Sequence, residues 1–549
     1  MANIVFVISL LAPNIILLNT SEQRFWSQFA ALMIPLGFYA IWCALSRRAG
    51  IMVWLSLPFI ILAAFQLVLL YLFSGSAIES NMFTNILTTN YTEASELLGN
   101  IYPAVIAVCM IYIPQLWFAA YEIAHGERLH PAYILHMQGT GAMALIAGIV
   151  SLIPAFIVSD GREPLRADIF PANVLNNALL SSREYRYISD FDENSANFQY
   201  DATRENSSTE REIYVYIIGE ASRAHNWQLY GYGRQTNPQL AKRNDLVVFD
   251  KILTQSNATH KSVPMMLSSA PITNHDEIYH RRGLAELFNE IGIRTCFISN
   301  QSPNRAMIDN LAIEADIAIY IHNPRYDMQL IEQMQRQIER FTDNDMLFIL
   351  HCYGSHFSYR QRYPSQFARF QPDNEAPISR ENIEQLTNAY DNSILYTDHI
   401  IASTIDYLES LKDCSSALIY CADHGEDLFD DTRERFLHSS PMTTYYQLHV
   451  ASLAWFSESY RAHHPEKCNA TRQNAHHVAT TRSMFHTLAD IASIESRYID
   501  RSLSLANQQF DPLAPHYYLN DHNCAVSFLS TGLSEEDIRL FQQRGIDLR

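Results

Sequence analysis

Long apolar runs dominate the first 160 residues. Hardly a charge interrupts them, and they fall at 4–18, 29–45, 51–73, 101–120 and 137–158. A helix needs about 20 apolar residues to cross a bilayer, and the last three runs meet that length. The first run is short and has a signal-peptide core as its alternative, but no charged segment precedes it and no small-residue cleavage site follows it. We therefore predict a transmembrane domain of five helices over 1–160 rather than five successive buried core helices.

The basic residues of the short connecting segments predict the orientation of these helices. Arg47 and Arg48 follow the second run, and Arg128 follows the fourth. Both segments fall on one side of the membrane, and their Arg content marks that side as the cytoplasm. An odd number of spans then places the rest of the chain on the opposite side. The 74–100 segment lies there too, either as a helix on the membrane surface or as a plain connecting loop.

The pattern changes twice beyond the fifth run. Residues 161–209 are polar and broken by prolines, which predicts a linker. From 210 onward, helical patterns alternate with short apolar runs: IYVYIIG, TCFISN, MLFILHCYG and SALIYCAD. Runs that are apolar at every position are typical of strands buried on both faces. We predict an α/β domain with a mostly parallel sheet over 210–549.

Composition supports this division and excludes one class of partner. The chain has 549 residues, 48% of them hydrophobic, and a mean hydropathy of only −0.10, because the apolar first part is offset by a polar remainder. The formal net charge is −19 and falls mostly in that remainder. Nucleic acid binding requires clustered Lys and Arg, so we expect no nucleic acid partner. A bound metal would offset part of the acidity locally.

Candidate chemistry gathers where the predicted strands end. Glu220 follows the first strand, His351 and His356 lie at the end of the third, and Asp423 and His424 follow the fourth. Ligands bind at the carboxyl ends of strands in open α/β sheets, so these side chains are expected to converge on one crevice. Oxygen and nitrogen ligands without thiolate suit Zn²⁺ or Mn²⁺. Each residue alone has an ordinary alternative, as a helix cap, a surface histidine or a turn residue.

Thr259 opens the segment THKSVPMMLS, which has the pattern of a helix start. The free N–H groups and the dipole at a helix N-terminus favour a phosphate. A threonine hydroxyl is a poor nucleophile unless a base or a metal activates it. A metal held by Glu220, Asp423 and His424 would supply that activation. This combination predicts phosphoryl transfer through a phosphothreonine, although a plain helix cap is the simpler alternative for Thr259.

Five longer motifs surround these positions: IIGEASRAHNWQLYGYGRQTNP, THKSVPMMLS, GSHFSYRQRYP, AYDNSILYTDHII and ADHGEDLFDD. Together with the apolar first part, they resemble the phosphoethanolamine transferases of Gram-negative bacteria. That family includes the enzymes that modify lipid A and the lipopolysaccharide core, and the mobile colistin-resistance enzymes. The resemblance runs over nearly the whole chain.

The resemblance implies a set of properties for this chain. These are an alkaline-phosphatase-like fold, zinc (with Mn²⁺ second), and a multi-pass inner-membrane monomer whose catalytic domain lies in the periplasm. Phosphoethanolamine would pass from phosphatidylethanolamine to the threonine and then to lipid A or the lipopolysaccharide core. We also expect the membrane part to take part in catalysis, with the 74–100 segment (Glu79, Asn81, Asn90 and Glu93) along the path of the lipid.

The family's site residues carry over to this chain by position. Glu220, Thr259, Asp423 and His424 fall on the primary zinc site, with Thr259 as the nucleophile. His356 and His438 fall on histidines that bind the substrate phosphate or a second zinc. Arg305 falls where relatives often carry a lysine, and an arginine keeps the charge and grips phosphate with two bonds.

Some features depart from the family, and three other classes remain open. Met265 replaces a frequent cysteine, and the outer domain lacks the family's cysteine pattern, although Cys468 and Cys524 could pair with each other. A sulfatase shares the fold, but its C-x-P-x-R motif is absent. A glycerol-phosphate transferase of the lipoteichoic-acid type has a similar layout and differs in its donor. A non-catalytic receptor is disfavoured because every ligand position is filled.

Overall fold

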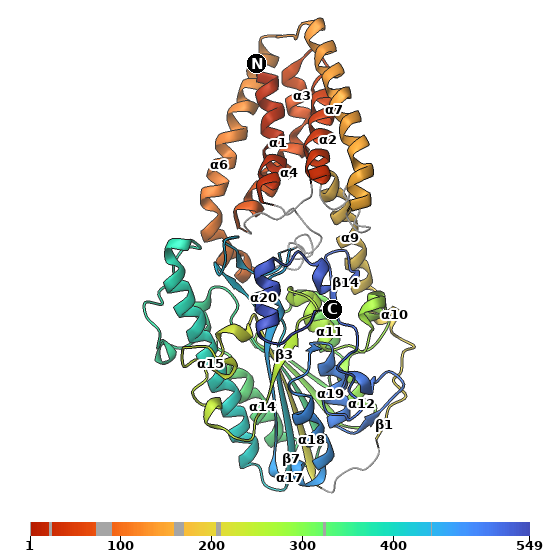
Figure 1. Cartoon of the computed structure of the whole chain (residues 1–549), viewed down its shortest axis with the longest axis vertical. Helices are drawn as coiled ribbons and strands as arrows, with labels where there is room; N and C mark the ends of the chain where they lie inside the picture. The colour runs from red at the N-terminus through yellow and green to blue at the C-terminus, as the bar shows by residue number, and fades with distance from the viewer. Residues whose placement is uncertain are drawn as a thin grey trace. The chain divides into compact units, whose positions relative to one another are not determined.

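The computed structural model describes residues 2–20, 25–72, 91–158, 169–204, 210–321, 326–440 and 442–548 (Figure 1). The chain forms two compact units. The first comprises Met1–Leu87 and Tyr91–Arg183, and the second comprises Thr88–Asn90 and Glu184–Arg549. The division falls within helix α9 (Ala172–Ser189), so the segment predicted as a linker contributes to both units.

The first unit is built from apolar helices: α1 (Ala2–Thr20), α2 (Phe25–Cys43), α3 (Ala49–Leu55), α4 (Leu57–Leu72), α6 (Tyr91–Ala124) and α7 (Pro131–Val158). Three are long and apolar enough to cross a membrane, namely α2 and most of α6 and α7. A fourth candidate is the pair α3 and α4, bent by 57°. In α1, the apolar stretch is shorter, over Asn3–Leu18. The described residues thus form a helical membrane region with three or four candidate spans, where the sequence predicted five.

Two local features shape this membrane unit, a serine at a bend and a glycine at a helix contact. Ser56 lies at the bend between α3 and α4, where its hydroxyl donates to the carbonyl of Met52 at 2.7 Å, a contact typical of bent helices. Gly37 of α2 faces α7 so closely that an added Cβ would lie 2.6 Å from the carbonyl oxygen of Gly141. Small residues of this kind let membrane helices pack backbone against backbone.

The 74–100 segment is only partly covered by the described residues. Residues 73–90 lie outside them, including Glu79, Asn81 and Asn90. From Tyr91 on, the chain is part of α6, which contains Glu93. The expected lipid path therefore stays a prediction.

The second unit contains an eight-stranded sheet in the order β11-β3-β10-β7-β2-β6-β4-β5. Its strands are β2 (Arg211–Gly219), β3 (Val247–Leu253), β4 (Arg294–Ser299), β5 (Ile317–Tyr320), β6 (Met346–His351), β7 (Cys414–Ala422), β10 (His449–Phe456) and β11 (Ala479–Thr480). Within this sheet, β10 pairs antiparallel with both neighbours, and the other pairings are parallel. The short strands β1 (Thr203–Arg204), β8 (Asp427–Leu428), β9 (Phe436–Leu437), β12 (Ile494–Glu495), β13 (Tyr517–Leu519) and β14 (Ala525–Ser527) form separate two-stranded pairs.

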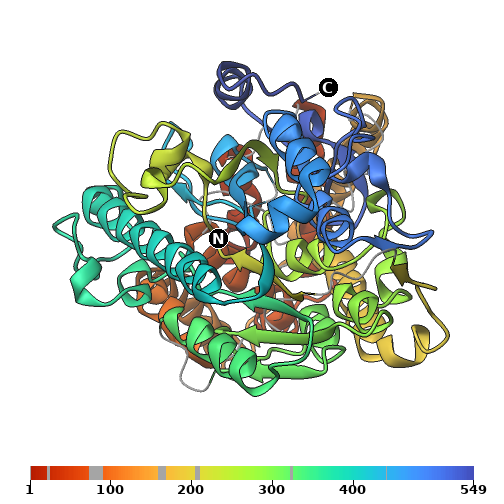
Figure 2. The same cartoon turned by 90° about the horizontal axis from the view of Figure 1, so that it is seen from below.

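Helices cover both faces of the large sheet (Figures 1 and 2). One face carries α14 (Met328–Arg340) and α15 (Ile383–Ser410), and the other carries α12 (Leu284–Asn289) and α19 (Ser483–Ile491). The remaining helices of this unit are α10 (Phe191–Asn194), α11 (Thr259–Met266), α13 (Met307–Ala312), α16 (Tyr445–Leu448), α17 (Glu458–His463), α18 (Pro465–Asn474) and α20 (Glu535–Gln543). Coverage on both faces explains why the central strands are apolar at nearly every position.

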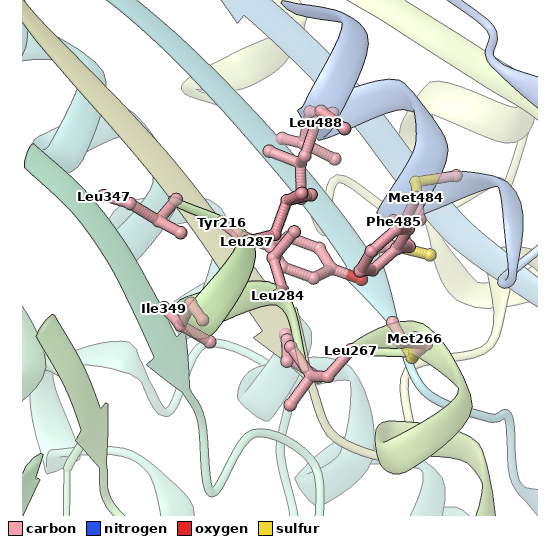
Figure 3. Packing of buried hydrophobic residues seen from close by; sticks show 14 of the residues in the cluster. Tyr216, Met266, Leu267, Leu284, Leu287, Leu347, Ile349, Met484, Phe485 and Leu488 are labelled. Atoms are coloured by element: carbon pink, nitrogen blue, oxygen red, sulfur yellow. The ribbon is translucent and has the colours of Figure 1, made fainter. Parts of the chain in front are cut away.

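The core beneath the site is tightly filled (Figure 3). Tyr216 of β2 and Ile349 of β6 pack in one cluster with Leu284 of α12, Phe485 of α19 and Met266 at the end of α11. All five side chains are at most 1% exposed. Close-packed cores are hardly compressible. The cluster therefore holds the ends of β2 and β6 in fixed positions.

Candidate metal-binding and catalytic site

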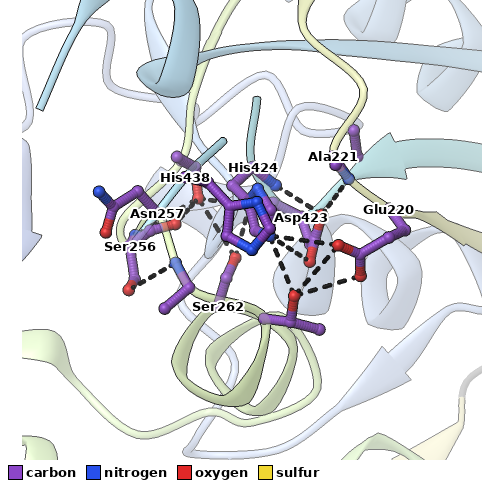
Figure 4. Close-up of polar contacts among 12 residues, drawn as sticks. Glu220, Ala221, Ser256, Asn257, Ser262, Asp423, His424 and His438 are labelled. Carbon is purple, nitrogen blue, oxygen red and sulfur yellow. Dashed lines mark hydrogen bonds and ion pairs between the residues drawn. The ribbon is translucent and has the colours of Figure 1, made fainter. Parts of the chain in front are cut away.

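Four of the predicted residues meet at the carboxyl edge of the sheet (Figure 4). Glu220 directly follows β2, Asp423 and His424 directly follow β7, and Thr259 is the first residue of α11. The Thr259 hydroxyl lies 3.2 Å from Oε2 of Glu220 and 3.0 Å from Nε2 of His424. His424 Nε2 is also 3.4 Å from Oε1 of Glu220 and 3.3 Å from Oδ2 of Asp423. The sequence therefore predicted correctly that these four side chains converge.

The start of α11 is fixed against the end of β7. The hydroxyl of Ser262, in the first turn of the helix, donates to the carbonyl oxygen of Asp423 at 2.6 Å, and the hydroxyl of Thr254 donates to the same atom. Thr259 is half-buried while Glu220, Asp423 and His424 are fully buried. Thr259 is thus the partly exposed residue among the four.

The unsatisfied atoms of this cluster fit a divalent cation. Oδ1 of Asp423 accepts the backbone N–H groups of Ala221 at 3.0 Å and His424 at 2.7 Å, whereas its buried Oδ2 has no hydrogen-bond partner among the described residues. Nδ1 of His424 donates to the carbonyl of Gly425 at 2.8 Å, which directs Nε2 into the cluster. Two carboxylates, an imidazole and a hydroxyl are a donor set that zinc accepts.

The electrostatics of these side chains also favour a bound cation. Burial alone would raise the pKa of Glu220, but the hydrogen bond and charge of His424 hold that pKa well below its usual range. Burial and the negative charge of Glu220 raise the pKa of Asp423 far above its usual range. Two buried carboxyl groups this close cannot both ionise without a nearby cation. A bound metal would remove that conflict.

His438 extends the cluster on one side. Glu220, His424 and His438 offer ligand atoms that all lie within 4.8 Å of one another. The rings of His424 and His438 are 4.1 Å apart between centroids, and those of His438 and His356 are 6.4 Å apart. His356, His438 and His424 are thus neighbours on one side of the site. The role that the resemblance gives His356 and His438, binding substrate phosphate or a second zinc, stays a prediction.

Arg305 is not brought to this cluster. It is exposed, has a positive φ of 61°, and its backbone N–H donates to Asp309 at 2.6 Å. In the described part of the chain, its guanidinium has no hydrogen bond or ion pair with any cluster residue. The reason is local: the turn after β4 folds back onto the start of α13, and Asp309 accepts the backbone of that turn. Its predicted role in binding phosphate stays a prediction.

Sequence reasoning missed two residues that touch the site. Oε1 of Glu426 lies 3.1 Å from Nδ1 of His438, and burial raises the pKa of Glu426 to about 8. Gln301 donates to Oε2 of Glu220 at 3.0 Å. His351, in contrast, makes no hydrogen bond or ion pair with the four cluster residues within the described part of the chain, and its Nδ1 lies 3.2 Å from the hydroxyl of Ser299. The quoted motif ADHGEDLFDD already contained Glu426, but no pattern singled out Gln301.

The cysteines of the second unit do not form the disulfide that was considered. Cys468 is buried in α18 and Cys524 is exposed beside the β13–β14 hairpin, and both are free thiols. The pairing of Cys468 with Cys524 is therefore wrong. Met265, at the position of the family's frequent cysteine, is a buried core residue.

Comparison with known proteins identifies the family. The sequence profile of the sulfatase family matches residues 212–494, more than half of the chain, and the chain belongs to that family. The matched region contains Glu220, Thr259, Asp423 and His424.

Named relatives place the chain close to one branch of this family. It is 31% identical over 302 residues to the phosphoethanolamine transferase EptA of Escherichia coli K12, an alignment that covers 52% of this chain and 54% of that protein. The chain thus spans about half the length of this relative. The periplasmic domain of E. coli EptC in complex with Zn superposes with a TM-score of 0.55 at 25% identity, covering 61% of this chain and 97% of that chain.

One solved structure matches nearly the whole chain. The integral membrane protein lipooligosaccharide phosphoethanolamine transferase A (EptA) of Neisseria meningitidis superposes with a TM-score of 0.71, covering 92% of this chain and 98% of that chain. The sequence identity is 22%, so this likeness shows the fold alone. A helical membrane region followed by a sulfatase-like domain is therefore a shared arrangement, and the resemblance drawn from the motifs is confirmed.

Proposed function

We propose that this protein is a zinc-dependent phosphoethanolamine transferase that uses Thr259 as its nucleophile. The observation that carries the proposal is the position of the Thr259 hydroxyl, 3.0 Å from His424 and 3.2 Å from Glu220 at a helix N-terminus. A hydroxyl in contact with two ligand-type side chains, on a residue that is only half-buried, is arranged for attack on a phosphorus atom. The likeness to enzymes named phosphoethanolamine transferase supports this choice of substrate.

Glu220, Thr259, Asp423 and His424 would hold the zinc ion. When bound, zinc would lower the pKa of the Thr259 hydroxyl and neutralise charge on the phosphate. The backbone contacts of Asp423 and His424 fix both side chains, so that Nε2 of His424 lies 3.0 Å from the hydroxyl and 3.3 Å from Oδ2 of Asp423. No rearrangement of these side chains is then required before the chemical step.

The reaction proceeds in two displacements in this proposal. In the first, the Thr259 oxygen loses its proton and forms a bond to the phosphorus of phosphatidylethanolamine, the bond from phosphorus to the diacylglycerol oxygen breaks, and diacylglycerol leaves with a proton. In the second, an acceptor oxygen attacks the same phosphorus, and the Thr259 oxygen leaves and regains its proton. His356 and His438 lie on one side of the cluster, where they would bind the phosphate oxygens or a second zinc ion.

The donor and acceptor are membrane lipids, so the membrane region belongs to the proposal. We propose that it crosses the inner membrane five times, with α1 and the bent pair α3–α4 as the two less regular spans, and that the catalytic domain lies in the periplasm. The acceptor is lipid A or the lipopolysaccharide core, and the enzyme acts as a monomer. Lipid substrates require the site to work close to the membrane surface.

Lipid analysis of cells tests the function. Lipopolysaccharide from a strain lacking the protein should lack an ethanolamine-phosphate group that reappears when the wild-type chain, but not Thr259→Ala, is restored. A glycerol-phosphate group in its place would reassign the donor to the glycerol-phosphate class. Identical lipid masses in all strains, with the protein produced at normal level, would contradict the proposal.

A further inference from the structure

Gln301 contacts the site without belonging to the predicted ligand set. Among the described residues, it is the one side chain outside that set that hydrogen-bonds to the carboxylate of Glu220. Its Nε2 lies 3.0 Å from Oε2 of Glu220 and 2.8 Å from the carbonyl oxygen of Cys352. A side-chain amide has two N–H donors, so both are used in this position. Gln301 thereby ties the Glu220 carboxylate to a backbone atom of a different segment.

The backbone of Gln301 is itself held in place. The hydroxyl of Ser299, the last residue of β4, accepts the N–H of Gln301 at 3.1 Å and donates to its carbonyl at 3.0 Å. The intervening residue, Asn300, donates its backbone N–H to the carbonyl of His351 on β6 at 2.9 Å. The amide of Gln301 therefore extends from the rigid end of a central strand.

The anchor at Cys352 is fixed by a buried carboxylate. Asp327, just before α14, accepts the N–H of Tyr353 at 2.8 Å through Oδ1 and the N–H of Gly354 at 2.9 Å through Oδ2. The same Oδ1 accepts the side-chain amide of Asn300 at 2.8 Å. Asp327 is 5% exposed. Asp327 thus joins Asn300, after β4, to Tyr353 and Gly354, after β6. These are the two segments that the amide of Gln301 also links.

We propose that Gln301 is a positioning residue for Glu220, and that Asp327 fixes the carbonyl that anchors it. The inference rests on the proposed function, because that function makes Glu220 a zinc ligand. The free carboxylate of a glutamate can rotate, and one oxygen held by Gln301 restricts it to an orientation that faces His424 and Thr259. Removing a hydrogen bond of this kind to a metal ligand typically weakens metal affinity about 10–100-fold.

Zinc affinity of the full-length protein in detergent tests this proposal without any turnover. We would measure the zinc dissociation constant by competition with a chromogenic chelator for wild type, Gln301→Met and Gln301→Asn. Gln239→Met is the matched control, because Gln239 is also half-buried and also uses its amide, in a contact with His399 at 3.2 Å. We expect about a 10–100-fold weaker affinity for Gln301→Met, an intermediate value for the shorter amide of Gln301→Asn, and no change for Gln239→Met.

The outcomes separate this proposal from the proposed function. If wild type binds zinc and Gln301→Met binds it equally tightly, the positioning role is wrong while the metal site stands. If wild type binds no zinc, the metal site fails and the role of Gln301 fails with it. If Gln301→Met does not fold, Asp327→Asn decides, because its amide cannot accept both N–H groups through two oxygens. Its zinc affinity should also fall, and an unchanged affinity would overturn the proposal.

Discussion

The hydroxyl of Thr259 lies 3.0 Å from Nε2 of His424, although 165 positions separate the two residues in the chain. The contact exists because α11 begins where β7 ends, and two hydroxyl groups bind the carbonyl of Asp423 to hold them together. The proposed nucleophile and the proposed metal-ligating imidazole are thus positioned by contacts that do not depend on either side chain.

Thr259→Ala should abolish transfer and leave the fold intact. The side chain is half-buried, and its removal leaves the backbone contacts of α11 unchanged. The loss should be at least about 1,000-fold, as for other catalytic nucleophiles. Transfer to lipid acceptors, measured with purified protein and normalised to folded protein, checks this. Thr259→Ser keeps a hydroxyl and should retain measurable activity. Substantial activity of Thr259→Ala would remove Thr259 from this role.

Zinc affinity should increase with pH. Burial would lower the pKa of His424, but the charges of Asp423 and Glu220 raise it to about 10 in the metal-free protein. Zinc binds the neutral imidazole, so binding must release this proton. Asp423 must also lose any proton it holds, because burial and the charge of Glu220 raise its pKa. The dissociation constant should therefore rise at least about tenfold for each pH unit lost between about pH 9 and 6, and more steeply where both ligands are protonated.

The raised pKa of His424 also makes the stability of the protein without zinc depend on pH. This stability should decrease as the pH rises, whereas the zinc affinity should increase. The pKa of His424 is higher in the folded state than its unfolded value of about 6.5, so folding binds a proton. The resulting stabilisation is complete below about pH 6.5 and is lost as the pH rises through about 10. Chelator competition and thermal unfolding over this range measure both effects. A zinc affinity that is independent of pH would show that no proton is displaced.

Gly354→Ala should damage both stability and activity. Gly354 has a φ of +45°, and an added Cβ would lie 2.8 Å from the backbone N and O of Glu220. An alanine at positive φ costs more than about 1 kcal/mol, and the contact would also displace Glu220. The apparent Tm and zinc affinity should both fall. Gly233→Ala is the control, because an added Cβ there has no atom within 4 Å. Equal behaviour of the two variants would contradict this account of the turn.

Much of the site could be predicted from the sequence because it lies next to strongly patterned strands. Glu220 and Asp423 directly follow the apolar stretches IYVYIIG and ALIYCA of β2 and β7, and Thr259 begins a recognisable helix. Strand ends in a parallel sheet meet at one edge, so their convergence follows from the pattern alone. The convergence was therefore predictable without knowledge of any distance.

The contacts that tune the site could not be predicted in this way. Gln301 reaches Glu220 across 81 positions, through a side-chain amide in a loop with no periodic pattern. Arg305 lies only four residues further, yet the turn that Asp309 caps leaves it exposed. Loop direction depends on such side-chain-to-backbone bonds, which composition and spacing do not encode. The bend of 57° between α3 and α4 was missed because the apolar run at 51–73 continues without a break.

The predicted orientation of the membrane region can be tested with fusions to the C-terminus. In the proposed topology, the segments that contain Arg47, Arg48 and Arg128 lie in the cytoplasm, and five spans put the C-terminus on the other side of the membrane. An alkaline phosphatase fused after residue 549 should be active, and a green fluorescent protein fused there should be dark. A fluorescent fusion with inactive phosphatase would overturn the orientation or the number of spans.

The central claim is that Thr259 carries the phosphoethanolamine group between donor and acceptor. Intact-protein and peptide mass spectrometry, after incubation of the full-length enzyme with phosphatidylethanolamine and without an acceptor, measures this directly. We predict one ethanolamine-phosphate group on the peptide that contains Thr259, absent from Thr259→Ala and discharged when lipid A is added. An enzyme that transfers the group to lipid A while Thr259 stays unmodified, or that carries the adduct on another residue, would contradict the account.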